Sequence, residues 1–277
     1  MSRRIEAAFL KAKGEGRAAL IPYITAGYPD LARLSGLVRA LSQAGADVIE
    51  IGIPFSDPLA DGPVLQRAAT EALRQGVRIR DIMAAVREVA SGSPPLVFLT
   101  YINPVFRAGM GAFAHAARES GVEALIIPDL PWVEGTDLRR AASAEEMTII
   151  PLVAPTSTPQ HLWAIRRARG FVYGVSVTGV TGMRQDVDDG ARAMVARVKH
   201  VVPLPVALGF GISTPDQARE VGGWADGVIV GSALVKAIAE DPGNAEAVAF
   251  GMVSAFRQKM AAPSRTTPPA FVGGSQK

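Results

Sequence analysis

Short apolar runs recur along the chain, and each is followed by turn residues and then by a segment with helical apolar periodicity. Such runs predict parallel strands buried on both faces. The predicted strands span residues 19–25, 48–53, 96–101, 124–127, 148–153, 171–176, 206–209 and 228–230. The predicted helices span residues 1–16, 31–44, 65–75, 81–90, 113–120, 135–144, 159–168, 189–200, 215–221 and 233–239.

The strand–helix alternation predicts an α/β fold. Eight repeats of the unit are typical of a (β/α)8 TIM barrel, here with an extra N-terminal helix and an inserted helix after strand 2. A doubly wound open sheet is the competing architecture, but no glycine-rich dinucleotide fingerprint follows the first strand. We expect residues 1–260 to form one barrel domain. The Pro-, Ser-, Thr- and Gly-rich tail, residues 261–277, is expected to be disordered.

The second predicted strand contains an acid. Glu50 lies between Ile49 and Ile51, where burial would favour the neutral carboxyl and raise its pKa. Asp61 lies in the following loop, so both carboxyls fall at the carboxyl end of the barrel, where such folds place their chemistry. The pair is a candidate acid–base couple. A structural alternative is that Glu50 pairs with an arginine and that Asp61 only forms a turn.

Glycine-bearing loops follow the last three predicted strands, within residues 178–182, 209–213 and 231–232. Barrels commonly bind phosphate between the loops after strands 7 and 8, through bare backbone amides and a helix N-terminus. Glycine suits such a site because a Cβ would keep the anion away from the backbone. The loops therefore predict a phosphate pocket, although they could also be simple tight turns.

Composition narrows the chemistry. The chain has no cysteine, a net charge of +3 and no long apolar segment, so we expect no thiolate catalysis, nucleic acid partner or membrane span, and a cytoplasmic location. No lysine ends a predicted strand, which disfavours a Schiff base. The three histidines lie in helical segments without metal-ligand spacing, so no metal is expected. These features indicate a metal-free lyase or isomerase that acts on a small phosphorylated substrate.

At this level of detail the chain resembles the tryptophan synthase alpha subunit family over nearly its whole length. The motif from Glu50 to Pro63, Glu-Ile-Gly-Ile-Pro-Phe-Ser-Asp-Pro-Leu-Ala-Asp-Gly-Pro, carries the resemblance most strongly. Further matching segments are residues 22–30, 100–104, 128–131, 178–182, 209–213 and 231–232.

The resemblance implies cleavage of indole-3-glycerol phosphate to indole and glyceraldehyde 3-phosphate, within L-tryptophan biosynthesis. It implies that Glu50 is the acid–base group and that Asp61 holds the indole N–H. The substrate-binding residues implied by the resemblance are Tyr23, Tyr101, Tyr173, Thr181, Gly182, Gly211, Gly231 and Ser232.

The resemblance also implies a beta subunit partner that carries pyridoxal phosphate, in an alpha2-beta2 heterotetramer, and no cofactor in this chain. The residues expected to face that partner are Pro54, Phe55, Asp57, Asn103 and Asp129. Two alternatives remain at this point. One is a free-standing lyase of the same fold, and the other is an inactive barrel that only binds phosphate or regulates the beta subunit.

Overall fold

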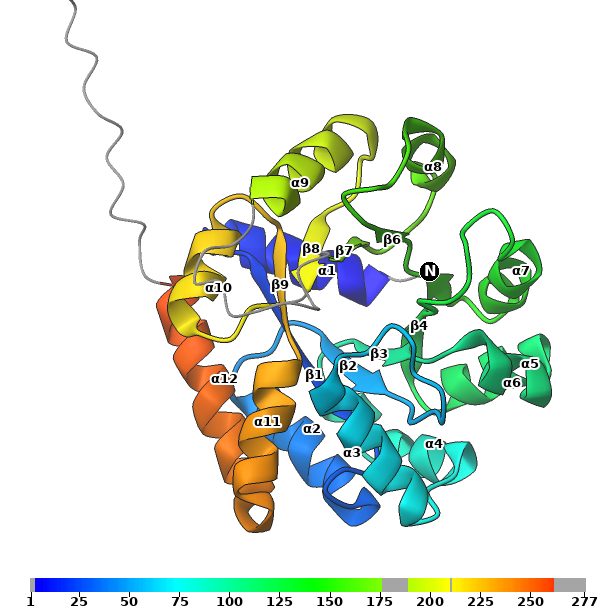
Figure 1. Cartoon of the computed structure of the whole chain (residues 1–277), viewed down its shortest axis with the longest axis vertical. Coiled ribbons are helices and arrows are strands. Elements are labelled where there is room, and N and C mark those ends of the chain that lie inside the picture. Colours follow the sequence, from blue (N-terminus) through cyan, green and yellow to red (C-terminus); the bar gives the residue numbers. More distant parts are fainter. Residues whose placement is uncertain (1–2, 176–188, 210, 262–277) are drawn as a thin grey trace, which may run out of the picture.

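A computed structural model describes residues 3–175, 189–209 and 211–261 of the chain. Over these residues, parallel strands form the centre of the molecule and helices surround them (Figure 1). The strands are β1 (Ala19–Thr25), β2 (Ile49–Gly52), β3 (Leu96–Leu99), β4 (Val122–Ile126), β5 (Thr148–Ile149), β6 (Leu152–Val153), β7 (Val172–Val175), β8 (Val206–Gly209) and β9 (Gly227–Val230).

The helices follow the strands in the expected alternation. They are α1 (Arg3–Gly14), α2 (Leu34–Gln43), α3 (Pro63–Arg74), α4 (Ile79–Arg87), α5 (Ile102–Ala108), α6 (Met110–Glu119), α7 (Thr136–Ala144), α8 (Pro159–Ile165), α9 (Asp189–Val201), α10 (Pro215–Gly222), α11 (Ser232–Glu240) and α12 (Ala245–Ala261). Three short 3-10 turns, at Leu31–Arg33, Ala90–Gly92 and Pro242–Asn244, complete the described elements.

The strands pair in the order β5-β4-β3-β2-β1-β9-β8-β7-β6, all in parallel. The two outermost strands, β5 and β6, are halves of the single strand predicted at residues 148–153. Pro151 divides them because it has no N–H to donate. The Ile150 N–H still donates to the Leu125 carbonyl of β4, and the Tyr173 N–H of β7 donates to the Pro151 carbonyl, both at 2.9 Å. This segment therefore closes the sheet into the predicted barrel.

The fold has two apolar layers. The larger lies between the strands and the outer helices, and the smaller fills the barrel interior with residues such as Ile21, Val97 and Ile229. Helix α1 belongs to the interior layer and crosses behind the strands in Figure 1. Its Phe9 packs on Phe171, just before β7, with ring centroids 5.3 Å apart. Because Phe171 lies at the amino end of β7, α1 covers the amino end of the barrel. The carboxyl end remains accessible.

The predicted extra helix at the N-terminus and the inserted helix after β2 are both present, as α1 and as the pair α3 and α4. Two helices were not predicted, α5 and α12. Helix α5 is short and begins within the predicted loop after β3, and α12 covers residues for which no element was expected. Ala261, the first residue of the predicted tail, is the last residue of α12. The rest of the tail lies outside the described residues.

Candidate active site

Glu50 points into the barrel. In the parallel register it lies beside Tyr23 of β1 and Val97 of β3, and both of these side chains belong to the interior layer or border it. Its side chain is only 1% exposed. Neither carboxyl oxygen has a hydrogen-bond partner among the described residues. The described residues therefore contain no structural pair between Glu50 and an arginine.

Burial sets the charge state of Glu50. Removal from water disfavours the carboxylate, and the nearby Asp61 adds repulsion, so the pKa of Glu50 rises from 4.5 to about 8. At neutral pH this side chain is mostly a neutral acid that can donate a proton. Such an unpaired, buried and perturbed group is typical of a functional site rather than of a core.

Asp61 lies at the end of the loop that joins β2 to α3. Its backbone N–H donates to the Pro58 carbonyl at 3.0 Å, and its own carbonyl accepts from Nε2 of Gln66 at 2.8 Å. Burial raises the pKa of Asp61 to about 6, while a hydrogen bond with Tyr101 acts in the opposite direction. At neutral pH Asp61 is therefore mostly ionised beside a mostly protonated Glu50. Two carboxyls whose pKa values differ in this way can take different roles, one as the acid and the other as an electrostatic stabiliser.

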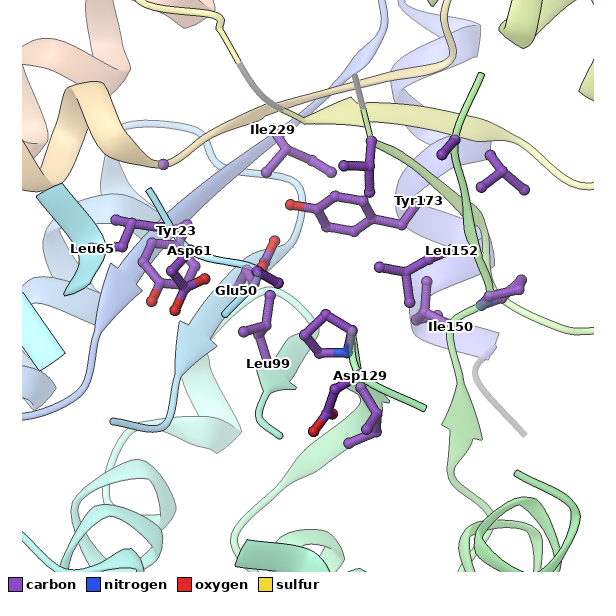
Figure 2. A pocket seen from close by; sticks show the side chains of 18 of the residues that line it. Tyr23, Glu50, Asp61, Leu65, Leu99, Asp129, Ile150, Leu152, Tyr173 and Ile229 are labelled. Atoms are coloured by element: carbon purple, nitrogen blue, oxygen red, sulfur yellow. The ribbon is translucent and has the colours of Figure 1, made fainter. Parts of the chain in front are cut away.

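Two tyrosines flank the acid, and each lies over a glycine. A Cβ on Gly52 would lie 2.0 Å from the hydroxyl oxygen of Tyr23, and one on Gly209 would lie 2.7 Å from that of Tyr173. Any larger residue at either glycine would push its tyrosine out of place. Figure 2 shows Glu50 with Tyr23 and Asp61 on one side and Tyr173 on the other. The pKa of each tyrosine is raised above its usual range, mainly by burial.

Two of the predicted glycine loops, at Gly211 and at Gly231 with Ser232, line the same cavity as Glu50. Gly211 has a φ of +79°, a conformation that favours glycine, and a Cβ there would meet no atom within 4 Å. Gly231 directly precedes α11, whose first residue is Ser232. The first backbone N–H groups of a helix have no partner within it and favour an anion. Gly211, Gly231 and Ser232 therefore present the backbone groups from which the sequence predicts a phosphate site.

One cavity of about 670 Å³ contains both features. Its wall includes Glu50 and Asp61 together with Gly211, Gly231 and Ser232. The acid and the glycine end therefore lie at the same rim of the barrel, as predicted. The remaining wall is largely apolar, with side chains such as Leu99, Leu152 and Ile229 (Figure 2). An apolar cavity with a few convergent polar groups suits a small ligand that has one aromatic and one anionic end.

The other predicted site residues fall into three groups. Tyr23 and Tyr173 line the cavity, whereas Tyr101 is not among its lining residues and stacks on Phe55 instead. Thr181 and Gly182 lie outside the described residues. The predicted partner-facing residues Pro54, Phe55, Asp57, Asn103 and Asp129 lie in the loop after β2, in α5 just after β3 and in the loop after β4. Asp129 also accepts a 2.9 Å hydrogen bond from the Ile102 N–H at the start of α5.

Three basic side chains on the cavity wall were not predicted as site residues, namely Arg139, His161 and Lys236. His161 Nε2 lies 2.9 Å from the Leu152 carbonyl oxygen, a bond that it makes as donor. Arg139 stacks over the Trp132 ring at 4.4 Å. All three come from helices, and the sequence pattern alone does not indicate which helical residues lean over a barrel mouth.

Two searches of the described residues bear on other site types. No group of three or more His, Cys, Asp or Glu side chains in residues 3–175, 189–209 and 211–261 is arranged to hold a metal ion. None of the helices in these ranges is both long and apolar enough to cross a bilayer.

Comparison with known proteins is consistent with this geometry. The family model described as tryptophan synthase alpha chain matches residues 9–264. The tryptophan synthase alpha chain of Synechocystis is 48% identical over 239 residues, which cover 85% of this chain and 90% of the relative. That of Thermoanaerobacter sp. is 46% identical and covers 88% of this chain and 93% of its own length.

Solved structures give the same result. A Legionella pneumophila tryptophan synthase alpha chain superposes with a TM-score of 0.87 at 33% identity, over 95% of this chain and 99% of its own. A chain of Mycobacterium tuberculosis tryptophan synthase superposes with a TM-score of 0.84 at 42% identity, over 92% and 98%. The chain thus belongs to the tryptophan synthase alpha chain family, the subunits that cleave indole-3-glycerol phosphate in tryptophan biosynthesis.

Proposed function

We propose that Glu50 and Asp61 carry out the cleavage of indole-3-glycerol phosphate in this chain. The observation that carries the proposal is the unpaired carboxyl of Glu50, buried in the same cavity as the glycine end. The neutral acid donates its proton to C3 of the indole ring. The resulting carboxylate then takes the proton of the adjacent glycerol hydroxyl as the carbon–carbon bond breaks, which releases indole and glyceraldehyde 3-phosphate and restores the neutral acid.

Asp61 supplies the electrostatic part of this mechanism. Protonation at C3 places a positive charge on the ring, centred on the indole nitrogen. An ionised Asp61 accepts a hydrogen bond from the indole N–H and stabilises that charge where it develops. This role fits the lower of the two carboxyl pKa values, about 6 for Asp61 against about 8 for Glu50. Tyr23 and Tyr173 hold the substrate beside Glu50 from the two sides.

The phosphate of the substrate binds at the other end of the cavity, to the backbone amides of Gly211, Gly231 and Ser232. Glycine at position 231 leaves the anion access to the backbone, and the N-terminus of α11 adds a favourable dipole. Thr181 and Gly182, which lie outside the described residues, complete the substrate site by resemblance to the family. The change Gly231→Val should raise the KM at least tenfold with a smaller effect on kcat; an unchanged KM would mean that the phosphate binds elsewhere.

The partner is a beta subunit that carries pyridoxal phosphate, in a cytoplasmic alpha2-beta2 assembly. Pro54, Phe55, Asp57, Asn103 and Asp129 would face it. In support, large apolar side chains stand exposed on the loops and helix after β2, β3 and β4, at the same rim: Leu59 at 91%, Phe106 at 68% and Val133 at 70%. Large apolar side chains exposed on neighbouring loops of one rim favour a protein interface there.

The proposal is tested by the release of indole from indole-3-glycerol phosphate by the Glu50→Gln protein. We expect loss of cleavage with the fold intact by circular dichroism and with phosphate binding retained. Glu220→Gln, an exposed residue of α10, is the matched control and should keep full activity. Near-native turnover by Glu50→Gln would refute the mechanism. Rates with and without added beta subunit separate the subunit from a free-standing lyase, since only the subunit should be strongly activated.

A further inference from the structure

Tyr101 is placed differently from the other two site tyrosines. It lies two residues after the end of β3, at the N-cap position of α5, and is only 2% exposed although it is not part of the cavity wall. Its ring stacks on Phe55, with centroids 5.2 Å apart and planes 28° apart. Such a stacked arrangement of two rings is favourable beyond the apolar area that it buries. Tyr101 therefore packs against the first part of the loop that carries Asp61.

The hydroxyl of Tyr101 contacts the last part of the same loop. It accepts a hydrogen bond from the Ala60 N–H at 3.0 Å, one residue before Asp61. The hydroxyl oxygen thus serves as the acceptor for Ala60, and its proton can be donated to a second group. That second group is the Asp61 carboxyl, with which Tyr101 interacts through a side-chain hydrogen bond. One side chain from a neighbouring strand end thus holds the loop at position 55 and again at positions 60 and 61.

We infer that Tyr101 is a positioning residue that holds the loop from Phe55 to Asp61 and keeps the Asp61 carboxyl in place, and ionised, beside Glu50. The inference rests on the function proposed above and adds to it a group that acts through Asp61 without touching the reacting atoms. It also explains why a tyrosine stands at a position that the cavity does not use.

The surroundings of Asp61 show why such a group is needed. The titratable groups that interact with it, among the described residues, are Glu50 from β2, Tyr23 from β1, Tyr101 from the end of β3 and Tyr173 from β7. All four are acids, so none supplies a positive charge that would favour the carboxylate. Burial raises the pKa of Asp61, and the hydrogen bond with Tyr101 is the influence that lowers it.

The change Tyr101→Phe tests this inference because it keeps the ring and its stack on Phe55 but removes the hydroxyl. We expect the acidic limb of the kcat/KM profile to move upward by about one pH unit, so that kcat/KM at pH 5 falls about tenfold, the size of one hydrogen bond to a charged group. KM should change little. Activity should recover as the pH rises and Asp61 ionises again.

Three further measurements keep the test decisive. Tyr28→Phe, at the tyrosine outside the cavity and the loop, should leave the profile unchanged. Phe55→Leu should lower kcat without moving the acidic limb, because it removes the stack and keeps the hydroxyl. NMR titration of the Asp61 carboxyl carbon, assigned with Asp61→Asn, should show a higher pKa in Tyr101→Phe than in the unchanged protein, whether or not either protein is active.

The outcomes separate the two proposals. If the unchanged protein fails to cleave indole-3-glycerol phosphate with and without the beta subunit, the proposed function is wrong. If it cleaves normally and Tyr101→Phe shows the same acidic limb, the same kcat/KM at pH 5 within about twofold and the same Asp61 titration, only the role given to Tyr101 is wrong. Should Tyr101→Phe fail to fold, a normal kcat in Phe55→Leu would refute the positioning role.

Discussion

Replacing Glu50 by glutamine should make the protein more stable at neutral and alkaline pH, even though we expect the same change to abolish the reaction. The carboxyl is 1% exposed and has no hydrogen-bond partner among the described residues. In the folded protein its pKa is about 8, whereas in the unfolded chain it returns to near 4.5. Between these values the unfolded chain releases a proton that the folded protein retains. The stability associated with Glu50 is therefore complete below about pH 4.5 and is lost as the pH rises toward 8.

The size of the effect follows from the two pKa values. Each pKa unit corresponds to about 1.4 kcal/mol, so the rise from 4.5 to about 8 amounts to about 5 kcal/mol by pH 8. Glutamine has the same shape and no ionisation. The unfolding free energy of Glu50→Gln relative to that of the unchanged protein should then increase by about 1.4 kcal/mol per pH unit from about pH 5 to pH 8.

Urea unfolding followed by circular dichroism at several pH values measures this difference. The change of this difference with pH matters more than the difference at any one pH, because the buried amide contributes an offset that does not depend on pH. Glu220→Gln on exposed α10 is the matched control and should show no comparable slope. A difference for Glu50→Gln that stays constant from pH 5 to pH 8 would mean that burial does not hold the proton on Glu50, and the acid role would fail with it.

Two further predictions concern activity and packing. The kcat/KM profile should rise through about pH 6, as Asp61 ionises, and fall through about pH 8, as Glu50 loses its proton; a flat profile over this range would contradict both assignments. The change Gly52→Ala should lower kcat/KM and destabilise the protein by about 1–3 kcal/mol, because its methyl group would overlap the Tyr23 hydroxyl. Gly251→Ala within α12, where a Cβ meets no atom within 4 Å, is the control, and equal effects of the two changes in urea unfolding would rule out this packing argument.

The sequence predicts the barrel and its catalytic rim because both depend on local patterns. Buried parallel strands are apolar on both faces, so a single glutamate such as Glu50 within one is conspicuous, and the rise of its pKa follows mainly from burial. Similarly, glycines after the last strands predict bare backbone at an anion site without knowledge of the distances. In each case the residue type and its position along the chain already contain the physical argument.

Other features depend on contacts between distant segments and could not be predicted in this way. Pro151 divides one predicted strand, yet its carbonyl still accepts a hydrogen bond from Tyr173 of β7. This bond can be seen only once the strands are paired. Gly52 is required by the hydroxyl of Tyr23, which lies on another strand. Tyr101 was expected on the indole pocket, but its contacts with Phe55 and Ala60 depend on how the loop folds back. Helix α12 has apolar residues on much of its surface and no simple amphipathic pattern.

The buried charges of the barrel differ between its two ends, and this difference identifies the working end. Near the amino ends of the strands, Asp47 accepts hydrogen bonds from the Arg17 guanidinium at 2.5 and 2.8 Å and from the Leu20 N–H at 2.8 Å. Glu123, also buried, pairs with Arg4 of α1 at 2.7 Å. Only Glu50, toward the carboxyl ends, is buried without a partner among the described residues. A buried carboxyl is normally paired, since isolation destabilises the fold. The acids at the amino end are thus paired within the chain, whereas Glu50 at the carboxyl end is left for a partner from outside the chain. The substrate, bound in the adjoining cavity, would supply that partner.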